Sequence, residues 1–158
     1  MFFWFIGAAT LAVWFVFHDP RFDNRFLILG VLIPDPIDLL WGGARGLHSV
    51  AASVALLLAI MLATMGRRPM RRRLLCLPIG TFLHLVFDGA FGNTRVFWWP
   101  FSGLSFSGAR LPSVERGLLN VVFEVFGIAL CAFAWRRFGL ADPDRRRSFL
   151  RTGSLAFV

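Results

Sequence analysis

Four long apolar segments constrain the fold of this chain more than any other feature of its sequence. They cover residues 1–17, 47–65, 74–91 and 118–135, and each approaches the roughly 17–25 residues that a helix needs to cross a bilayer. The chain of 158 residues is 57% hydrophobic and has a mean hydropathy of +0.67, which is too apolar for an ordinary soluble domain. We therefore expect an all-α integral membrane protein with about four transmembrane helices, forming a single membrane domain over residues 1–158.

The first segment and a fifth apolar run complete the expected helices. Segment 1–17 lacks a basic n-region and a small-residue cleavage site, which is typical of a retained membrane helix rather than a signal peptide. The run 26–41 is interrupted by Pro34 and Pro36, and each proline removes a backbone donor and clashes with the preceding turn. Such a run is either a kinked span or a pair of half-helices that enters and leaves on one side. We expect a broken or re-entrant helical segment at 26–45.

The arginines predict how the chain is oriented. Five of them lie in the loop 66–73 and six in the tail 136–158. The positive-inside rule places both regions in the cytoplasm, where 136–158 would form a basic tail. We expect a protein of the cell membrane that crosses it several times. A pI near 11.6 also suits nucleic-acid binding. The hydropathy argues against a nucleic-acid partner, because a basic membrane protein uses its charge for orientation and for anionic headgroups.

Ionisable side chains within apolar segments are costly and usually mark functional sites. His84 and Asp88 are four residues apart, so they share one helix face. Glu124 reaches a similar depth on segment 118–135. With a re-entrant run 26–41, all of these groups fall in the outer half of the membrane. The full set is Asp35, Asp38, His48, His84, Asp88, Glu124 and, at the end of the first segment, His18.

This set of side chains suits a divalent metal ion. Imidazole and carboxylate are ligands for zinc, manganese and iron, and magnesium is a weaker candidate once histidine takes part. A cation would neutralise the carboxylates, and no Lys or Arg lies between Phe26 and Gly43 to do so. We expect one or two divalent ions, with zinc or manganese preferred over magnesium or iron. The candidate ligands are Asp35, Asp38, His48, His84, Asp88 and His18.

Each of these residues also has a purely structural alternative. The acids of "DPID" have the form of a helix cap around a proline. A buried acid can be protonated and structural, and polar residues on membrane helices can bond to a neighbouring helix. Histidines at helix ends can be capping or interfacial residues. The cap would involve Asp35 and Asp38, and the protonated structural acid would be Glu124. His84 and Asp88 would bond to a neighbouring helix, and His48 and His18 would be the residues at helix ends.

Four short motifs resemble those of a known family. They are "LIPDPIDLL" (32–40), "RGLHS" (45–49), "HLVFDGAF" (84–91) and "WWPF" (98–101). In their order and their apolar setting they resemble the YdjM-like family of membrane-bound metal-dependent hydrolases, over roughly residues 26–101. The resemblance implies hydrolysis as the activity and implies that the metal ligands are Asp35, Asp38, His48, His84 and Asp88.

The chain departs from that family pattern at two positions. Leu39 stands where the pattern has a histidine directly after the second aspartate, and Leu47 stands where a threonine is more usual. His18 is a candidate to supply the missing ligand.

The leading functional hypothesis is a membrane-embedded metal-dependent hydrolase that acts on a lipid phosphoester. It would be a lipid phosphatase or a phospholipase-like enzyme, with a glycerophospholipid or phosphoinositide phosphate as substrate. A metal lowers the pKa of bound water to about 7 and polarises the phosphoryl group. Asp38 or Glu124 would orient that water or act as general base. The arginines expected to hold phosphate are Arg45, which is preferred for its position three residues before His48, and also Arg95, Arg110 and Arg116.

Two other classes of function stay open. Broken helices with His, Asp and Glu at membrane depth are also used by small ion- or proton-coupled transporters. A chain of this length would form a carrier only as a homo-oligomer. In a non-catalytic membrane assembly protein, the same polar residues would only bond helices together.

Overall fold

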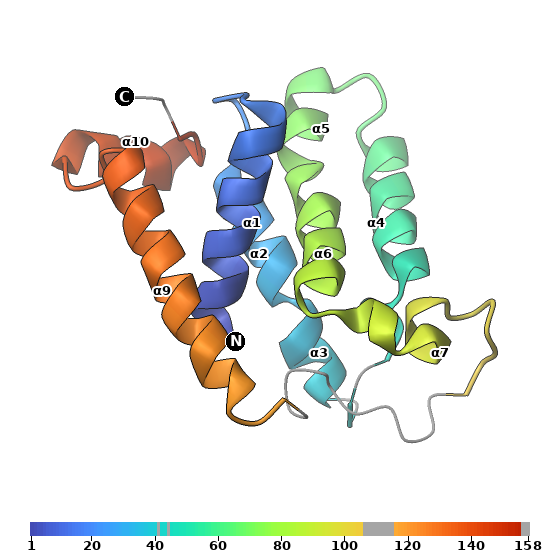
Figure 1. The fold of residues 1–158 in the computed structure, drawn as a ribbon. Coiled ribbons are helices and arrows are strands. Elements are labelled where there is room, and N and C mark those ends of the chain that lie inside the picture. Colours follow the sequence, from blue (N-terminus) through green and yellow to red (C-terminus); the bar gives the residue numbers. More distant parts are fainter. Residues whose placement is uncertain (41, 44, 106–115, 156–158) are drawn as a thin grey trace.

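The computed structural model describes residues 1–40, 42–43, 45–105 and 116–155, and in these residues every regular element is a helix (Figure 1). In chain order the elements are α1 (Phe2–Phe17), α2 (Asn24–Leu32), α3 (Pro34–Leu40), η1 (Gly46–His48), α4 (Val50–Ala63), α5 (Arg68–Leu74), α6 (Cys76–Phe87), η2 (Ala90–Gly92), α7 (Thr94–Phe97), α9 (Leu119–Arg137) and α10 (Pro143–Thr152). Four helices of 12 to 19 residues, α1, α4, α6 and α9, are joined by shorter helices and by two single 3₁₀ turns.

The helices form one bundle with two distinct ends. In Figure 1, α9, α1, α6 and α4 stand side by side, and α2 lies behind α1 and α6. The main contacts join α2 to α6, α1 to α9 and α1 to α2, followed by α4 to α6. At one end lie α3, η1, α7 and the beginning of α9, which we call the α3 end. At the other end lie α5 and α10, which we call the α5 end.

Glycines allow two of these helix pairs to approach closely. A Cβ atom on Gly80 of α6 would lie 2.8 Å from the backbone nitrogen of Val31 and 2.9 Å from the Cα of Gly30. A Cβ atom on Gly127 of α9 would similarly overlap the backbone of Trp4. Small residues at helix crossings allow backbones to meet without intervening side chains. The α2–α6 contact therefore holds the α6 backbone directly against the end of α2.

The proline pair breaks the helix at the position where the sequence predicts a break. α2 ends at Leu32 and α3 begins at Pro34, with a bend between them. Asp23 starts α2 by accepting a hydrogen bond from the backbone N–H of Arg25. The result is two short helices of 9 and 7 residues rather than one continuous apolar helix.

The prediction of about four transmembrane helices is wrong, whereas the predicted all-α class and the helix break within 26–45 are confirmed in the described residues. In the described residues, only α9, with 19 residues, is both long and apolar enough to cross a membrane. The helices α1 and α4 are apolar but have 16 and 14 residues, and α6 has only 12.

The apolar runs are longer than the helices within them, because turns end each helix early. His18 closes α1 in a left-handed conformation with φ of 47°. Segment 47–65 begins with the 3₁₀ turn η1 and ends at the left-handed Gly66. Segment 74–91 is cut at Asp88 and at Gly89, whose φ is 61°. Hydropathy reports composition over a window, and it does not show these interruptions.

The C-terminal region after α9 packs against the bundle. The Gly153 carbonyl accepts hydrogen bonds from the backbone N–H of Asn24 at 2.8 Å and from its side-chain amide at 3.0 Å. The Arg25 guanidinium donates to the carbonyls of Leu150 and Arg151, both at 2.9 Å. These bonds attach the end of α10 to the start of α2.

Candidate metal centre

Asp38 and His48 form a buried pair at the α3 end of the bundle. Asp38 lies in α3, and its Oδ2 is 2.7 Å from Nδ1 of His48. The same oxygen accepts the backbone N–H of Arg45 at 2.8 Å. Because a carboxylate can only accept here, Nδ1 of His48 carries the hydrogen, and its Nε2 is directed away from Asp38.

His84 is fixed in the equivalent tautomer by a backbone carbonyl. Its Nδ1 lies 2.8 Å from the carbonyl oxygen of Val31, at the end of α2, so Nδ1 donates. The Phe5 ring of α1 covers the imidazole, with ring centroids 4.4 Å apart. His84 is completely buried, and the close α2–α6 contact brings it within reach of Val31. Its Nε2 is therefore left for another partner.

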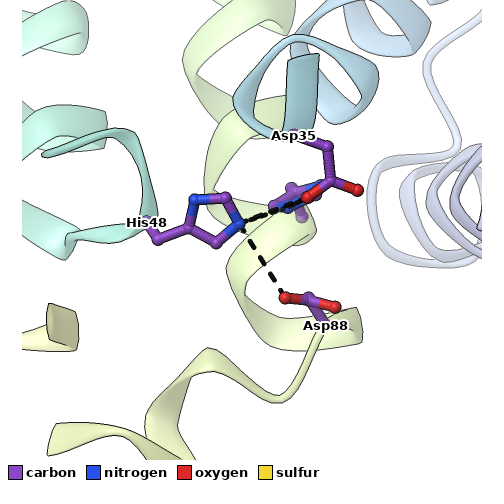
Figure 2. A group of neighbouring side chains, drawn as sticks. Asp35, His48 and Asp88 are labelled. Atoms are coloured by element: carbon purple, nitrogen blue, oxygen red, sulfur yellow. Dashed lines mark hydrogen bonds and ion pairs between the residues drawn. The ribbon is translucent and has the colours of Figure 1, made fainter. Parts of the chain in front are cut away.

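Four ligand atoms converge where these two rings meet. The Nε2 atoms of His48 and His84 are 3.2 Å apart. Oδ1 of Asp35 lies 3.3 Å from the first and 3.5 Å from the second. Oδ2 of Asp88, at the end of α6, is 3.9 Å from Nε2 of His48. Figure 2 shows Asp35, His48 and Asp88 pointing toward one another from three separate segments, and all four atoms lie within 4.8 Å of one another.

These distances, and carboxylate oxygens that lack hydrogen bonds, fit a metal ion. A tetrahedral ion with ligand bonds of about 2.0–2.1 Å has ligand–ligand edges of about 3.3–3.4 Å, close to the spacing among His48, His84 and Asp35. Oδ1 of Asp35 and both carboxylate oxygens of Asp88 are buried without a hydrogen-bond partner among the described residues. Buried polar atoms normally have partners. Asp35, His48, His84 and Asp88 therefore lie close enough to hold a metal ion, and their chemistry fits one.

The pKa values show how the group is balanced without a metal. Burial disfavours the charged forms, yet the histidines hold the pKa of Asp35 well below its usual range. For His48, burial is outweighed by the neighbouring carboxylates of Asp35 and Asp38, which raise its pKa to about 9. Burial raises the pKa of Asp88. A proton on His48 thus occupies the place between acceptors that a cation can take.

Access to the group is from the side of Asp35. The Asp35 side chain is 24% exposed, whereas the side chains of His48, His84 and Asp88 are at most 1% exposed. Three ligands are therefore closed off by protein, and the fourth borders solvent. Solvent therefore borders the group only beside Asp35, and a water on the ion would be a ligand in addition to these four residues.

Arg116 adds a cation beside the group. Its Nη1 lies 3.4 Å from Oδ1 of Asp88, and its Nη2 donates to the Asp88 backbone carbonyl. The guanidinium also lies over the Phe123 ring, 5.9 Å from its centroid. Arg116 belongs to the arginines expected to hold phosphate, but Arg45 is preferred from its position in the sequence. Arg116 and Asp88 are far apart in the chain, so the sequence does not indicate that they are in contact.

Two residues that the sequence predicts for the site lie outside the metal-binding group. The carboxylate of Glu124 accepts the backbone N–H groups of Phe2 and Phe3 at 2.9 and 3.2 Å, and so it caps α1. His18 ends α1, whereas Phe5 near the start of α1 contacts His84. Thirteen residues separate them, about 20 Å along a helix.

The expected arginines differ in position. Arg45 donates its backbone N–H to Asp38 and is exposed. Arg95 is exposed on α7, where its carbonyl accepts a hydrogen bond from the Ser102 hydroxyl. Arg110 lies outside the described residues. Of the three that the structure describes, Arg116 alone forms an ion pair with a residue of the metal-binding group.

The fold and the site define an all-helical protein with a buried histidine–aspartate group at one end. Comparison with protein-family models, with curated proteins and with solved structures finds no match for this chain. The resemblance to the YdjM-like family therefore stays a prediction that rests on the four motifs.

Proposed function

We propose that this protein is a metal-dependent hydrolase that cleaves a phosphoester of a membrane lipid. The observation that carries the proposal is the convergence of four acceptor atoms in a nearly closed site, with two histidines already fixed in the ligating tautomer. Four acceptors without a donor repel one another, so the arrangement is favourable only with a proton or a cation between them.

A single zinc or manganese ion fits this group best. Two imidazoles and two carboxylates are ligands that both metals accept. A second ion, about 3.5–4 Å away, would need further ligands. Asp38 is committed to His48 and to the backbone of Arg45. Asp38 is thus an orienting residue for a ligand, as carboxylates behind metal-bound histidines commonly are.

The surrounding residues suit phosphoester hydrolysis. A bound divalent ion would supply a water of lowered pKa and would polarise the phosphoryl group. Arg116 would hold a phosphoryl oxygen through its planar donors, in a position set by its ion pair with Asp88. Asp35, the most exposed acid of the group, would orient the attacking water by accepting a hydrogen bond through its second oxygen.

The surface at the α3 end favours a lipid as the substrate. Leu40, Phe101 and Leu118 are more than 80% exposed there. An apolar cavity of about 310 Å³ lies between α4 and α7, lined in part by Val50 and Trp98. Val50 is two residues from His48. An acyl chain in this cavity would bring its phosphoester close to the metal ligands.

Helix α9 would hold the enzyme at the cell membrane. Only 11% of its apolar window is buried, so few of its side chains are fully covered by protein. Its last turn carries Arg136 and Arg137, which the positive-inside rule places on the cytoplasmic side. The start of α9 and the metal-binding group would then face the outer side.

The proposal can be tested with the purified full chain in neutral detergent. A diacylglycerol phosphate is the substrate, and released inorganic phosphate is measured. We expect a chelator to abolish activity and zinc or manganese to restore it. Asp88→Asn should lower activity by more than about 100-fold, because it removes a ligand.

Asp144→Asn is the matched control, since it changes an exposed carboxylate of α10 and should leave activity unchanged. Hydrolysis that resists the chelator, or that survives Asp88→Asn, would contradict the proposal.

A further inference from the structure

A basic cavity lies at the α5 end of the bundle, opposite to the metal-binding group. It has a volume of about 860 Å³ and is bounded by α5, by the connection from α1 to α2, and by Thr152 at the end of α10. Four of its arginines come from the short helix α5. The cationic lining residues are Arg21, Arg68, Arg71, Arg72 and Arg73.

The charge of this cavity is largely unneutralised. Among the described residues, the carboxylate of Asp19 is the only one within 4 Å of these arginines, at 3.9 Å from Arg72. The nearby carboxylate of Asp23 is already paired with Arg25 at 2.7 Å. Five guanidinium groups thus face one acid, so the cavity favours an anion with several acceptor oxygens, such as a phosphate group.

The other wall of the cavity is apolar and leads into a groove. The rings of Phe17 and Phe22 stack with centroids 5.1 Å apart, and both line the basic cavity. Phe17 and Ile79 also line a neighbouring cavity of about 380 Å³ between α1, α4 and α6. Ser53 is the one polar residue of that second lining. The two cavities therefore adjoin, and the basic cavity continues into an apolar groove.

We propose that this composite cavity binds one anionic phospholipid, with the phosphate among the arginines and an acyl chain in the groove. A free phosphate would use only the basic half, and a neutral lipid would leave the arginines without an anion. Positive charge next to an apolar surface is the general requirement for anionic-lipid recognition.

This lipid is distinct from the proposed substrate. Arg72 and His84 are twelve residues apart along α5 and α6, about 18 Å at the usual helical rise. A phosphate held at Arg72 therefore lies out of reach of the metal ligands. The inference does not depend on the proposed hydrolase activity, because it concerns binding at the other end of the molecule.

The test measures lipid binding to the full chain in neutral detergent by native mass spectrometry. We expect one dioleoyl phosphatidylglycerol per chain and no retained phosphatidylcholine. Arg68→Gln combined with Arg71→Gln, which spares the Arg72–Asp19 pair, should weaken binding roughly 30-fold, from the usual contribution of two basic residues near an anionic surface. The control is Arg145→Gln with Arg147→Gln, an equal charge change on exposed α10.

A second pair of variants tests the groove. Ala12→Phe places a ring in the groove lining and should weaken binding of the dioleoyl lipid but not of a dihexanoyl lipid with the same headgroup. Ala132→Phe, on the exposed surface of α9, should change neither.

Three results would overturn the inference. They are equal binding of phosphatidylcholine, binding of glycerol phosphate as tight as that of the lipid, and equal losses in the α5 and α10 variants.

Discussion

Asp38 and the carbonyl of Val31 perform the same task for two different histidines. Each accepts the Nδ1 hydrogen of one ring, Asp38 from His48 and Val31 from His84. Each ring therefore presents an unprotonated Nε2 when it is neutral. The orientation of the ligands is set before any cation arrives, which lowers the entropy lost on binding.

Asp38→Asn should weaken metal binding without removing a ligand. The amide can still accept the Nδ1 hydrogen, but it loses the charge that raises the basicity of His48. Loss of such an orienting carboxylate typically costs 10–100-fold in metal affinity, which competition with a chromophoric chelator would measure. Asp19→Asn is the control, and an unchanged affinity for Asp38→Asn would show that the carboxylate only caps its helix.

The pKa of His48 predicts how the metal-free protein responds to pH. A folded-state pKa of about 9 lies above the ordinary value of 6.5, so the protonated ring stabilises the fold. The stabilisation is fully present below pH 6.5 and is lost as the pH rises through about 9. Chemical denaturation of the metal-free protein at pH 6, 8 and 10 should show it.

His48→Gln is the reference for that measurement. The difference in free energy of unfolding between the native chain and His48→Gln should shrink as the pH rises. A difference that grows between pH 6 and pH 10 would contradict the assigned pKa shift. Metal binding should show the opposite trend and strengthen up to about pH 9, because the ion displaces the His48 proton.

At the level of single residues, the sequence identifies which residue types can be ligands, but not which residue binds the metal and which orients a ligand. The spacing of His84 and Asp88 already places them on one helix face, and the structure brings both into the group. Asp35 and Asp38 are indistinguishable in "DPID", because their roles depend on where His48 returns to α3. The partner of His84 is a backbone carbonyl, which every residue carries, so no sequence signal reveals it.

At the level of elements, the α2–α6 crossing determines whether the group can form. Gly80→Leu would force a side chain against the backbone of α2, where a Cβ atom already meets Val31 nitrogen at 2.8 Å. Overpacking usually costs about 1–3 kcal/mol, and backbone contact puts this variant at the upper end. Thermal unfolding and metal affinity should both fall, since the bond from His84 to Val31 would be lost.

Gly92→Ala is the control for that prediction. A Cβ atom at Gly92 has no atom within 4 Å, so the change should leave unfolding and metal binding almost unaltered. Equal stability of the two variants would contradict the close helix approach.

Breaks in the helices were predictable, but helix lengths were not. Pro34 and Pro36 predict the end of α2, because proline has no backbone N–H to donate and its φ is fixed. The turns at Gly66 and Gly89 need a left-handed backbone, which glycine permits without requiring. Whether a glycine ends a helix is decided by tertiary contacts, and for this reason four apolar segments contain only one helix of spanning length among the described residues.

At the level of the whole molecule, α9 is the element proposed to attach the protein to a membrane. Ile128 lies near its middle and is 50% exposed. Ile128→Arg should reduce membrane attachment, because an arginine at the centre of a spanning helix costs about 2.5–3.5 kcal/mol of insertion. The measurement is the fraction of protein that stays with membranes after alkaline extraction.

Leu150→Arg on α10 is the matched control, since Leu150 is exposed outside α9. It should leave the membrane-bound fraction unchanged. An unaltered fraction for Ile128→Arg would contradict anchoring by α9.

The metal content of the purified protein tests the central claim most directly. Elemental analysis of the full chain, with His84→Gln and His18→Gln as variants, separates the buried group from the histidine at the far end of α1. We expect about one zinc or manganese ion per chain in the native protein and in His18→Gln, and a loss to background in His84→Gln. A native protein without a stoichiometric divalent ion after exposure to these metals, or one whose metal survives His84→Gln, would contradict a metal centre at this site.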